Sequence, residues 1–286
     1  MNICSVIDKS SINALALGGF DGLHLGHREL IKRLGENGAL LAIEHDRVCL
    51  TPDCVRERFC PVPVIIVPLE RIMELTPVQF IAELKEEFVN LKRLVVGYDF
   101  RFGKDRAAGS KELQTIFDGE TIVVSEVSLG GTAVHATRIR SLLLDGNVSG
   151  AARLLARPHI IEGKVVRGQG LGSKRLYPTI NLSVEKFLAP QDGVYAACTE
   201  IGARSYQSVS FVGRRLSADG AFSIETHIIE EGAQIPPIDR VAIWFIDRLR
   251  GNRRFEDLDA LKEQIAKDVA TAKTILTYKE NECANL

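Results

Sequence analysis

The first half of the chain alternates short apolar runs with amphipathic segments. The segment 26–34 has the apolar spacing of a helix. A second helix is predicted over 76–87, where Thr76 is an N-cap and Pro77 takes the first helical position. The apolar runs predict strands, at 13–17, 40–43, 62–67, 94–96 and 121–127. Strands that alternate with helices indicate a largely parallel α/β sheet, whose ligands bind beyond the carboxyl ends of the strands.

The pattern changes after two short helical segments, 140–144 and 149–155. Closely spaced apolar runs punctuated by Gly, Pro or Asp then predict strands, at 160–166, 193–198, 208–212, 222–229 and 241–246. Such strands without intervening helices are typical of an antiparallel barrel or sandwich, and 255–272 has the spacing of a closing helix. We therefore expect two domains, 1–156 and 157–286, because Arg157-Pro158 interrupts the helical pattern.

The amino-acid composition and charge exclude several classes of function. The 286 residues suffice for two cores, and 36 Lys+Arg against 37 Asp+Glu leave a net charge of −1 with neither half a basic block. Duplex nucleic acid is therefore not an expected partner. The sequence has no apolar run of membrane length and no signal-peptide pattern at its start, so we expect a cytoplasmic protein without a membrane partner. Six cysteines without a Cys-x-x-Cys motif predict reduced, mostly buried thiols.

A candidate phosphate site joins the first strand to the first helix. Four glycines, one Asp and two His fall within the ten residues 18–27. Glycines let backbone approach a ligand closely, and a helix N-terminus attracts anions. His24 and His27 share a helical face and can donate to one phosphate. A dinucleotide-binding glycine motif is absent, and Gly97–Lys104 lacks the spacing of a P-loop, so dehydrogenase and GTPase functions are not favoured.

A second glycine-rich stretch, 163–182, runs from a strand into a loop with Lys174 and Arg175 and ends in Pro178-Thr179-Ile180-Asn181. Mobile glycine backbone and cations can wrap phosphates, while a Thr hydroxyl and an Asn carbonyl are hard oxygen ligands for Mg²⁺. Taken alone, these features favour an ordinary glycine-rich turn before a strand.

Several motifs in order resemble one family. Gly18–His27 resembles the G-x-F-D-G-x-H-x-G-H signature of the bacterial bifunctional riboflavin kinase/FAD synthetase family, a branch of the nucleotidylyltransferases. Val96–Lys104 is similar to its G-x-D-F-R-F-G segment, and Thr137–Arg140 to the end of its S-S-T-R-I-R motif. The stretch 163–182 resembles the riboflavin kinase glycine motif, and 222–229 the strand that bears its catalytic glutamate. The resemblance covers nearly the whole chain.

This resemblance implies a fold and two activities. Residues 1–156 would form a Rossmann-like nucleotidylyltransferase domain with a parallel sheet, which transfers AMP from ATP to FMN and yields FAD and pyrophosphate. Residues 157–286 would form an antiparallel β-barrel riboflavin kinase domain with a closing helix, which phosphorylates riboflavin to FMN. ATP and flavins are then the partners and Mg²⁺ the cofactor. The sequence does not give the oligomeric state.

The resemblance also implies roles for individual residues. His24 and His27 would stabilise ATP phosphates, and Glu225 would be the general base towards the ribityl hydroxyl, its pKa raised by apolar neighbours. Further ATP-binding positions would be Gly18, Phe20, Asp21, Thr137, Arg138, Arg140, Gly168, Gly170, Lys174, Thr179 and Asn181. Thr179 and Asn181 would also hold Mg²⁺. The flavin-binding positions would be Asp99, Arg101 and Arg250.

Departures from the motifs leave alternatives open. His135 and Ala136 stand where the family motif has two serines, so His135 either donates a hydrogen bond in their place or weakens the site. His45 is either the counterpart of the family's Pro-His-Pro histidine or a surface residue, and Arg138 equally fits a solvated helix face. One alternative function is an active riboflavin kinase whose N-terminal domain only binds flavin or nucleotide. Another, a transferase acting on a pantetheine- or nicotinate-type acceptor, leaves Thr179, Asn181 and Glu225 unexplained.

Overall fold

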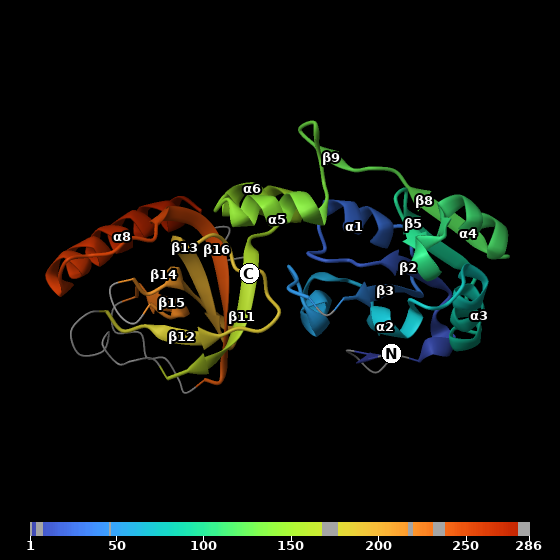
Figure 1. Ribbon diagram of the computed structural model, residues 1–286, viewed down its shortest axis with the longest axis horizontal. Coiled ribbons are helices and arrows are strands. Elements are labelled where there is room, and N and C mark those ends of the chain that lie inside the picture. Colours follow the sequence, from blue (N-terminus) through green and yellow to red (C-terminus); the bar gives the residue numbers. More distant parts are fainter. Residues whose placement is uncertain are drawn as a thin grey trace. The chain divides into compact units, whose positions relative to one another are not determined.

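The computed structural model of the chain describes residues 2–3, 8–45, 47–167, 177–216, 220–230 and 238–279. Contacts divide it into two compact units, Met1–Ala136 and Thr137–Leu286. The helices α5 (Ala136–Leu144) and α6 (Val148–Leu155) precede the barrel of the second unit, and α6 packs on two of its strands (Figure 1). The second unit thus begins before residue 157, and the functional boundary at 156/157 stays a prediction.

The first unit is built on one twisted sheet. Its strands are β1 (Asn2–Ile3), β2 (Ala14–Gly18), β3 (Gly38–Glu44), β4 (Val64–Pro68), β5 (Arg93–Gly97) and β8 (Glu120–Val124), in the order β1-β4-β3-β2-β5-β8. Only the edge strand β1 is antiparallel to its neighbour; the other pairs are parallel. The strand order reverses at β2, which pairs with both β3 and β5. A parallel sheet with such a reversal has its ligand crevice at the carboxyl ends of those strands.

The helices of this unit confirm both predicted helical segments. They are α1 (Leu25–Ile31), α2 (Leu69–Ile72), α3 (Pro77–Glu87) and α4 (Ser110–Ile116). The α3 helix begins at the predicted N-cap: Thr76 Oγ1 accepts from Gln79 N (3.3 Å), and Gln79 Oε1 accepts from Thr76 N (2.9 Å). The α4 helix was not predicted; Glu112 at its start accepts from Gly109 N (2.7 Å).

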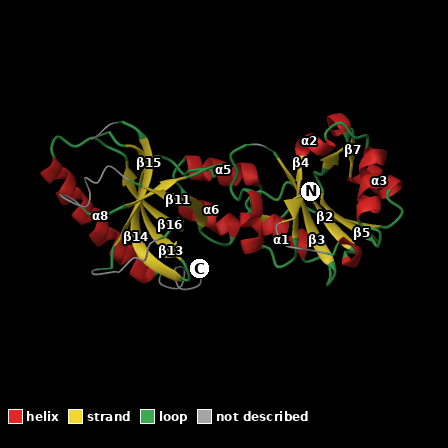
Figure 2. Ribbon diagram, turned by 90° about the horizontal axis from the view of Figure 1, so that it is seen from below, coloured by secondary structure: helices red, strands yellow, loops and turns green. Residues whose placement is uncertain are grey.

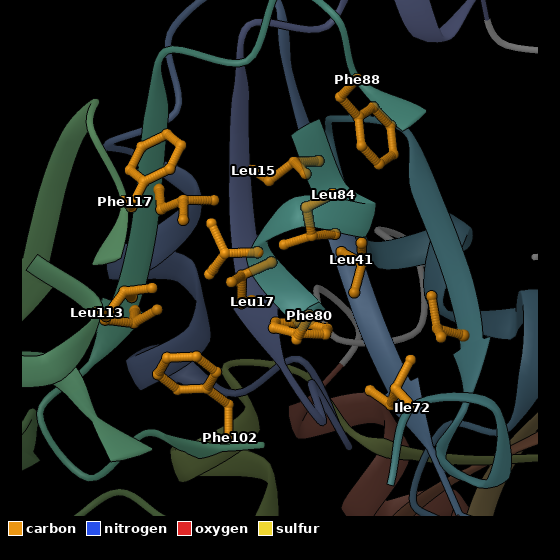
Figure 3. Close-up of a cluster of buried hydrophobic side chains, with 14 of the residues drawn as sticks. Leu15, Leu17, Leu41, Ile72, Phe80, Leu84, Phe88, Phe102, Leu113 and Phe117 are labelled. Carbon is orange, nitrogen blue, oxygen red and sulfur yellow. The ribbon is translucent and has the colours of Figure 1, made fainter. Parts of the chain in front are cut away.

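Two apolar layers sandwich the sheet. Because side chains alternate along a strand, Leu15 and Leu17 of β2 pack with Phe80 of α3, whereas Ala14 and Ala16 face the layer that α1 covers (Figure 3). Burying each large apolar side chain stabilises the fold by about 1.5–3 kcal/mol. The rigid sheet between these layers fixes the loops that leave β2 and β5.

The second unit is a closed antiparallel barrel, as predicted. Its strands are β11 (His159–Val166), β12 (Ile180–Ser183), β13 (Gly193–Ile201), β14 (Arg204–Arg214), β15 (Phe222–Ile228) and β16 (Arg240–Gly251), in the order β11-β12-β15-β14-β13-β16. The α8 helix (Leu258–Tyr278) packs against β13, β14 and β16 (Figure 2). It begins at Asp257, whose Oδ1 accepts from Ala260 N (2.8 Å).

Four buried hydroxyls link β13, β14 and β15. Thr199 Oγ1 lies 2.8 Å from both Ser208 Oγ and Thr226 Oγ1, and Ser210 Oγ donates to Thr226 Oγ1 (2.9 Å). All four side chains have 0% exposure. Because buried polar groups are costly unless paired, this network favours one register of β15 against β14.

The cysteine expectation is partly wrong. Cys49 and Cys60 are free thiols, but Cys54 and Cys198 each take part in a disulfide. Spacing along the sequence cannot reveal such pairs, since disulfides depend on distances between Cα atoms in the fold. In the described part of the chain, the helices are too short or too polar to cross a bilayer.

Candidate active sites

The loop after β2 carries the predicted phosphate motif to the carboxyl edge of the sheet. Phe20 (φ 46°), Gly22 (φ 84°) and Leu23 (φ 44°) have left-handed backbone conformations. This conformation costs about 1–2 kcal/mol for a residue other than glycine. Burial of the Phe20 and Leu23 side chains, each 1% exposed, offsets that cost. The core therefore holds the loop in the turn that leads to His24.

The side chains of Asp21 and Phe20 both hold this loop in its conformation. Asp21 Oδ1 accepts from Leu50 N (2.7 Å) and Thr51 N (3.2 Å), while Thr51 Oγ1 accepts from Gly22 N (2.8 Å). The Phe20 ring packs edge-on against the ring of His27, with 5.1 Å between centroids. Contacts of Gly18, Phe20 and Asp21 with ATP stay predictions.

His24 and His27 lie against each other at the start of α1. Their rings stack with 3.6 Å between centroids and 20° between planes. His24 is also the N-cap of α1, because its Nδ1 accepts from His27 N (3.4 Å). Since Nδ1 accepts, the neutral His24 ring carries its proton on Nε2. Gly26 leaves room for the stack: a Cβ there would lie 3.1 Å from His24 Cε1 and 3.4 Å from the Val134 carbonyl oxygen.

Both of these rings are neutral at pH 7. Burial lowers the pKa of His24 to about 4, and the charge of His135 lowers it further against the opposing effect of Asp21. Burial also holds the pKa of His27 well below its usual range, with His24, Arg56 and His135 adding to the effect. Each ring can therefore donate one hydrogen bond, but neither brings positive charge to a phosphate.

Sequence reasoning missed Arg56, which lies in the short 3₁₀ segment Asp53–Phe59. Its side chain is 1% exposed and its Nη1 donates to Glu44 Oε1 (2.7 Å) at the end of β3. Arg56 Nε and His27 Nδ1 are both buried without a hydrogen-bond partner among the described residues. The segment Asp53–Phe59 shows no helix or strand periodicity, so only the structure reveals that Arg56 and His27 both have buried nitrogen atoms without a partner in the described part of the chain. The neighbouring His45 is exposed, and its role stays open.

Three polar side chains gather at the same edge of the sheet. Tyr98 follows β5, Glu126 follows β8, and His135 follows the hairpin β9 (Ser128–Leu129) and β10 (Thr132–Ala133). Glu126 Oε1 accepts from Tyr98 Oη (2.7 Å) and lies 3.1 Å from His135 Nε2. Tyr98 and Glu126 were not predicted as site residues, because their contact joins two loops that are distant in the sequence.

The remaining predicted residues of the adenylyl-transfer site fall into two groups. Asp99 and Arg101 are exposed on the segment after β5, where they stay flavin-binding predictions. Thr137, Arg138 and Arg140 lie on α5, in the second compact unit. Thr137 and Arg138 are exposed, whereas Arg140 is half-buried.

The structure brings the predicted kinase residues together. Asn181 of β12 is the register partner of Glu225 of β15. Thr179 Oγ1 donates to Glu225 Oε2 (3.4 Å), and Ser223 Oγ donates to Glu225 Oε1 (2.7 Å). Ser223 Oγ also lies 3.5 Å from Asn181 Oδ1. Sequence reasoning named three of these four residues and missed the role of Ser223, two positions from Glu225 on the same strand face.

The surroundings of Glu225 are polar, so the expected apolar environment is wrong. Arg215 Nη1 lies 3.7 Å from Glu225 Oε1. Side chains alternate along β15, because Ile224 and Thr226 are buried while Ser223 and Glu225 are only half-buried. Apolar neighbours along the sequence point to the opposite face of the strand, which is why they do not surround the carboxylate.

The oxygen atoms around Glu225 suit a magnesium ion. Hydroxyl, amide and carboxylate oxygens are the hard ligands that Mg²⁺ prefers. Groups of three or more His, Cys, Asp or Glu that could hold a metal do not occur within the described ranges. Three of the predicted ATP-binding residues, Gly168, Gly170 and Lys174, lie outside the residues that the structure describes.

Arg250, predicted to contact flavin, is bound to the closing helix. Its Nε lies 3.0 Å from each carboxylate oxygen of Asp268 and its Nη2 lies 2.8 Å from Oδ2. Gln264 Nε2 also donates to Asp268 (2.8 Å), and the guanidinium lies 5.5 Å from the Phe255 ring centroid. Arg250 therefore anchors α8 to the barrel, and its contact with flavin stays a prediction.

Comparisons with known proteins match both units. A riboflavin kinase family model matches residues 155–276, and an FAD synthetase model matches 64–138. The bifunctional riboflavin kinase/FMN adenylyltransferases of Pseudomonas fluorescens and Escherichia coli K12 are each 29% identical, over 91% of this chain and 91% of theirs. A crystal structure titled as a macrolide-efflux protein from Streptococcus pneumoniae superposes with a TM-score of 0.81 at 27% identity, over 96% of this chain and 97% of that one.

The first unit has a Rossmann-type sheet whose loop carries His24 and His27, and the barrel gathers oxygen ligands suited to Mg²⁺ around Glu225. Together these two sites define a two-domain, nucleotide-dependent transferase. The family matches over both parts of the sequence then identify the kind of transferase. The chain combines a riboflavin kinase domain with an FAD synthetase domain, and it is similar over 91% of its length to bifunctional enzymes that carry both.

Proposed function

We propose that this chain converts riboflavin to FAD in two steps. Riboflavin and ATP give FMN and ADP in the barrel; FMN and a second ATP give FAD and pyrophosphate in the α/β domain. The observation that carries this proposal is the grouping of Thr179, Asn181 and Glu225, in a chain whose other domain matches FAD synthetase. Relatives that align over nine-tenths of the chain carry both activities in their names.

In the kinase step, Glu225 is the general base. The ribityl hydroxyl oxygen attacks the γ-phosphorus of ATP, the bond between that phosphorus and ADP breaks, and the hydroxyl proton passes to a Glu225 oxygen. Ser223 and Thr179 orient the carboxylate by their hydrogen bonds to its two oxygens. Their role is positioning, which matters because the acceptor and the base must meet in line with the leaving group.

Magnesium supports the same step. We assign its ligands to the Thr179 hydroxyl and the Asn181 amide oxygen, which lie beside Glu225 on β12 and its approach. A Mg²⁺ ion held by these two oxygens would offset charge on the ATP phosphates. The chain's own contribution is the fixed β12–β15 register, which keeps these oxygens next to the base.

In the adenylyl-transfer step, the α/β domain positions two phosphates. An FMN phosphate oxygen attacks the α-phosphorus of ATP, a new phosphorus–oxygen bond forms, and the bond to pyrophosphate breaks. His24 and His27 each donate one N–H to phosphate oxygens, and Thr137 and Arg140 bind the β/γ end of ATP. Asp99 and Arg101 lie after β5 and bind the flavin substrate.

The product profile tests both activities. Purified chain is incubated with riboflavin, ATP and Mg²⁺, the flavins are separated by chromatography, and a parallel reaction starts from FMN. We expect FMN and FAD from riboflavin, and FAD from FMN. Failure to form FMN would contradict the kinase assignment, and FMN that never becomes FAD in either reaction would reduce the α/β domain to a binding module. Cytoplasmic location and the absence of a nucleic-acid partner remain predictions.

A further inference from the structure

The proposed adenylyl-transfer site contains a third histidine, His135, which lies against the side chains of Glu126 and Tyr98. We propose that His135 binds an ATP phosphate as an imidazolium cation, held in place by Glu126 and Tyr98. This inference rests on the proposed function and concerns the same site. It makes His135 a phosphate-binding residue and makes Glu126 and Tyr98 positioning residues.

Geometry places His135 beside the double-histidine loop. Its neighbour Val134 is 3% exposed, and the Val134 carbonyl oxygen lies 3.4 Å from the position that a Cβ of Gly26 would occupy. Gly26 separates His24 from His27, so the segment before His135 contacts the start of α1. The backbone bond from Val134 N to Val127 O (2.9 Å) fixes this segment. His135 itself is 38% exposed and can reach a ligand.

Hydrogen bonding decides the protonation state that the ligand requires. His135 Nε2 lies 3.1 Å from Glu126 Oε1. A carboxylate oxygen only accepts, so Nε2 must carry a proton that it donates to Glu126. Tyr98 Oη donates to the same oxygen (2.7 Å), and both donors lower the pKa of Glu126. With Nε2–H occupied, Nδ1 can donate to a phosphate only when the ring is doubly protonated.

The other two histidines of the site do not supply positive charge, which an imidazolium at His135 would add. His24 and His27 are neutral at pH 7, so they donate hydrogen bonds without offsetting the charge of a triphosphate. A charge-assisted hydrogen bond is stronger than a neutral one. The described titratable and charged groups around the cluster are His24, His27, Asp21, Arg56, Tyr98, Asp99 and Glu126.

The expected pH dependence has a definite sign. The imidazolium is the binding form, so raising the pH removes its proton and weakens ATP binding. KM for ATP in AMP transfer to FMN should therefore rise with pH. His24 does not obscure this change, because its pKa of about 4 keeps it neutral near pH 7 and above. Tyr98 stays protonated, since Glu126 raises its pKa to about 12.

Three substitutions test the proposal in the full chain. His135→Gln keeps a hydrogen-bond donor without charge, and we expect KM for ATP at the acid end to rise about tenfold and to lose its pH dependence. His135→Arg supplies a permanent cation and should restore a low KM that no longer varies with pH. Glu126→Gln weakens the hold on the imidazolium, so the rise in KM should begin at lower pH.

Two controls separate folding and catalysis from the proposed role. Glu120→Gln changes a carboxylate at the opposite end of β8 and should keep the original profile. FMN formation from riboflavin should be unchanged in every variant, since it uses the barrel. No FAD from the unmodified chain would overturn the adenylyl-transfer function itself. FAD formation with the same KM profile in His135→Gln, or equal losses in His135→Gln and His135→Arg, would overturn the role of His135 alone.

Discussion

His24 combines a structural and a chemical position in one side chain. Its Nδ1 caps α1, its ring stacks on His27, and its Nε2–H remains for a ligand. Burial keeps it neutral in the folded chain, although an exposed histidine in an unfolded chain takes up a proton near pH 6.5. The residue that the sequence marks as functional therefore also links folding to pH.

Acid should destabilise the α/β domain through His24. Its folded pKa is lowered from 6.5 to about 4, so the unfolded chain binds the proton first and stability is lost as the pH falls through that window. Between pH 7.5 and 5 the loss should be about 2 kcal/mol from this residue. Urea denaturation at both pH values measures it. His24→Asn keeps a capping oxygen without a titrating ring, so its stability should vary less with pH; an unchanged difference would refute the assignment.

Glu225 should be needed for one activity only. We expect Glu225→Gln to lower FMN formation by about 10²–10⁴-fold, since the amide cannot accept the ribityl proton. AMP transfer to supplied FMN should continue at the original rate, measured by chromatography of the flavins. Glu185→Gln, an exposed carboxylate in the same domain, serves as the matched control. A Glu225→Gln protein that still makes FMN at the original rate would rule out this base.

At the level of elements, α8 depends on one buried ion pair. Asp268 is 5% exposed and accepts from Arg250 and Gln264. We expect Asp268→Asn to weaken the docking of α8 by about 1–3 kcal/mol, because Arg250 loses its charged partner. Hydrogen exchange should then accelerate along 258–278. Asp259→Asn, exposed in the first turn of α8, should leave exchange nearly unchanged, and equal protection in both variants would contradict the anchor role.

Periodicity predicted most elements because each strand or helix buries one face or both. The capping signal at Thr76 located the start of α3, and apolar runs located the parallel strands. The α4 helix escaped because it is short and buries only Leu113. Site residues carried by motifs, such as Thr179 and Glu225, were found; Arg56, Ser223 and the Tyr98–Glu126 contact were not. These depend on which loops meet in space, which no local spacing encodes.

At the scale of the whole molecule, two sites share one chain of balanced charge. We expect His27→Gln to abolish most FAD formation from FMN while FMN formation from riboflavin continues, the converse of Glu225→Gln. Mixing the two variants with riboflavin should restore FAD, because FMN released by one can reach the other. Flavin chromatography of each variant and of the mixture measures this. If His27→Gln also stopped the kinase in a folded protein, the two sites would not act independently.

The stacked histidine pair has a consequence for how this sequence can change over generations. A substitution at Gly26 would push on the His24 ring, and a substitution at His24 would remove the cap of α1 together with the stack. Either of these two changes thus meets a penalty in folding in addition to its effect on chemistry. A copy that had lost adenylyl transfer but still had to fold would therefore be expected to keep Gly26 and His24, so these two residues alone are weak evidence of activity.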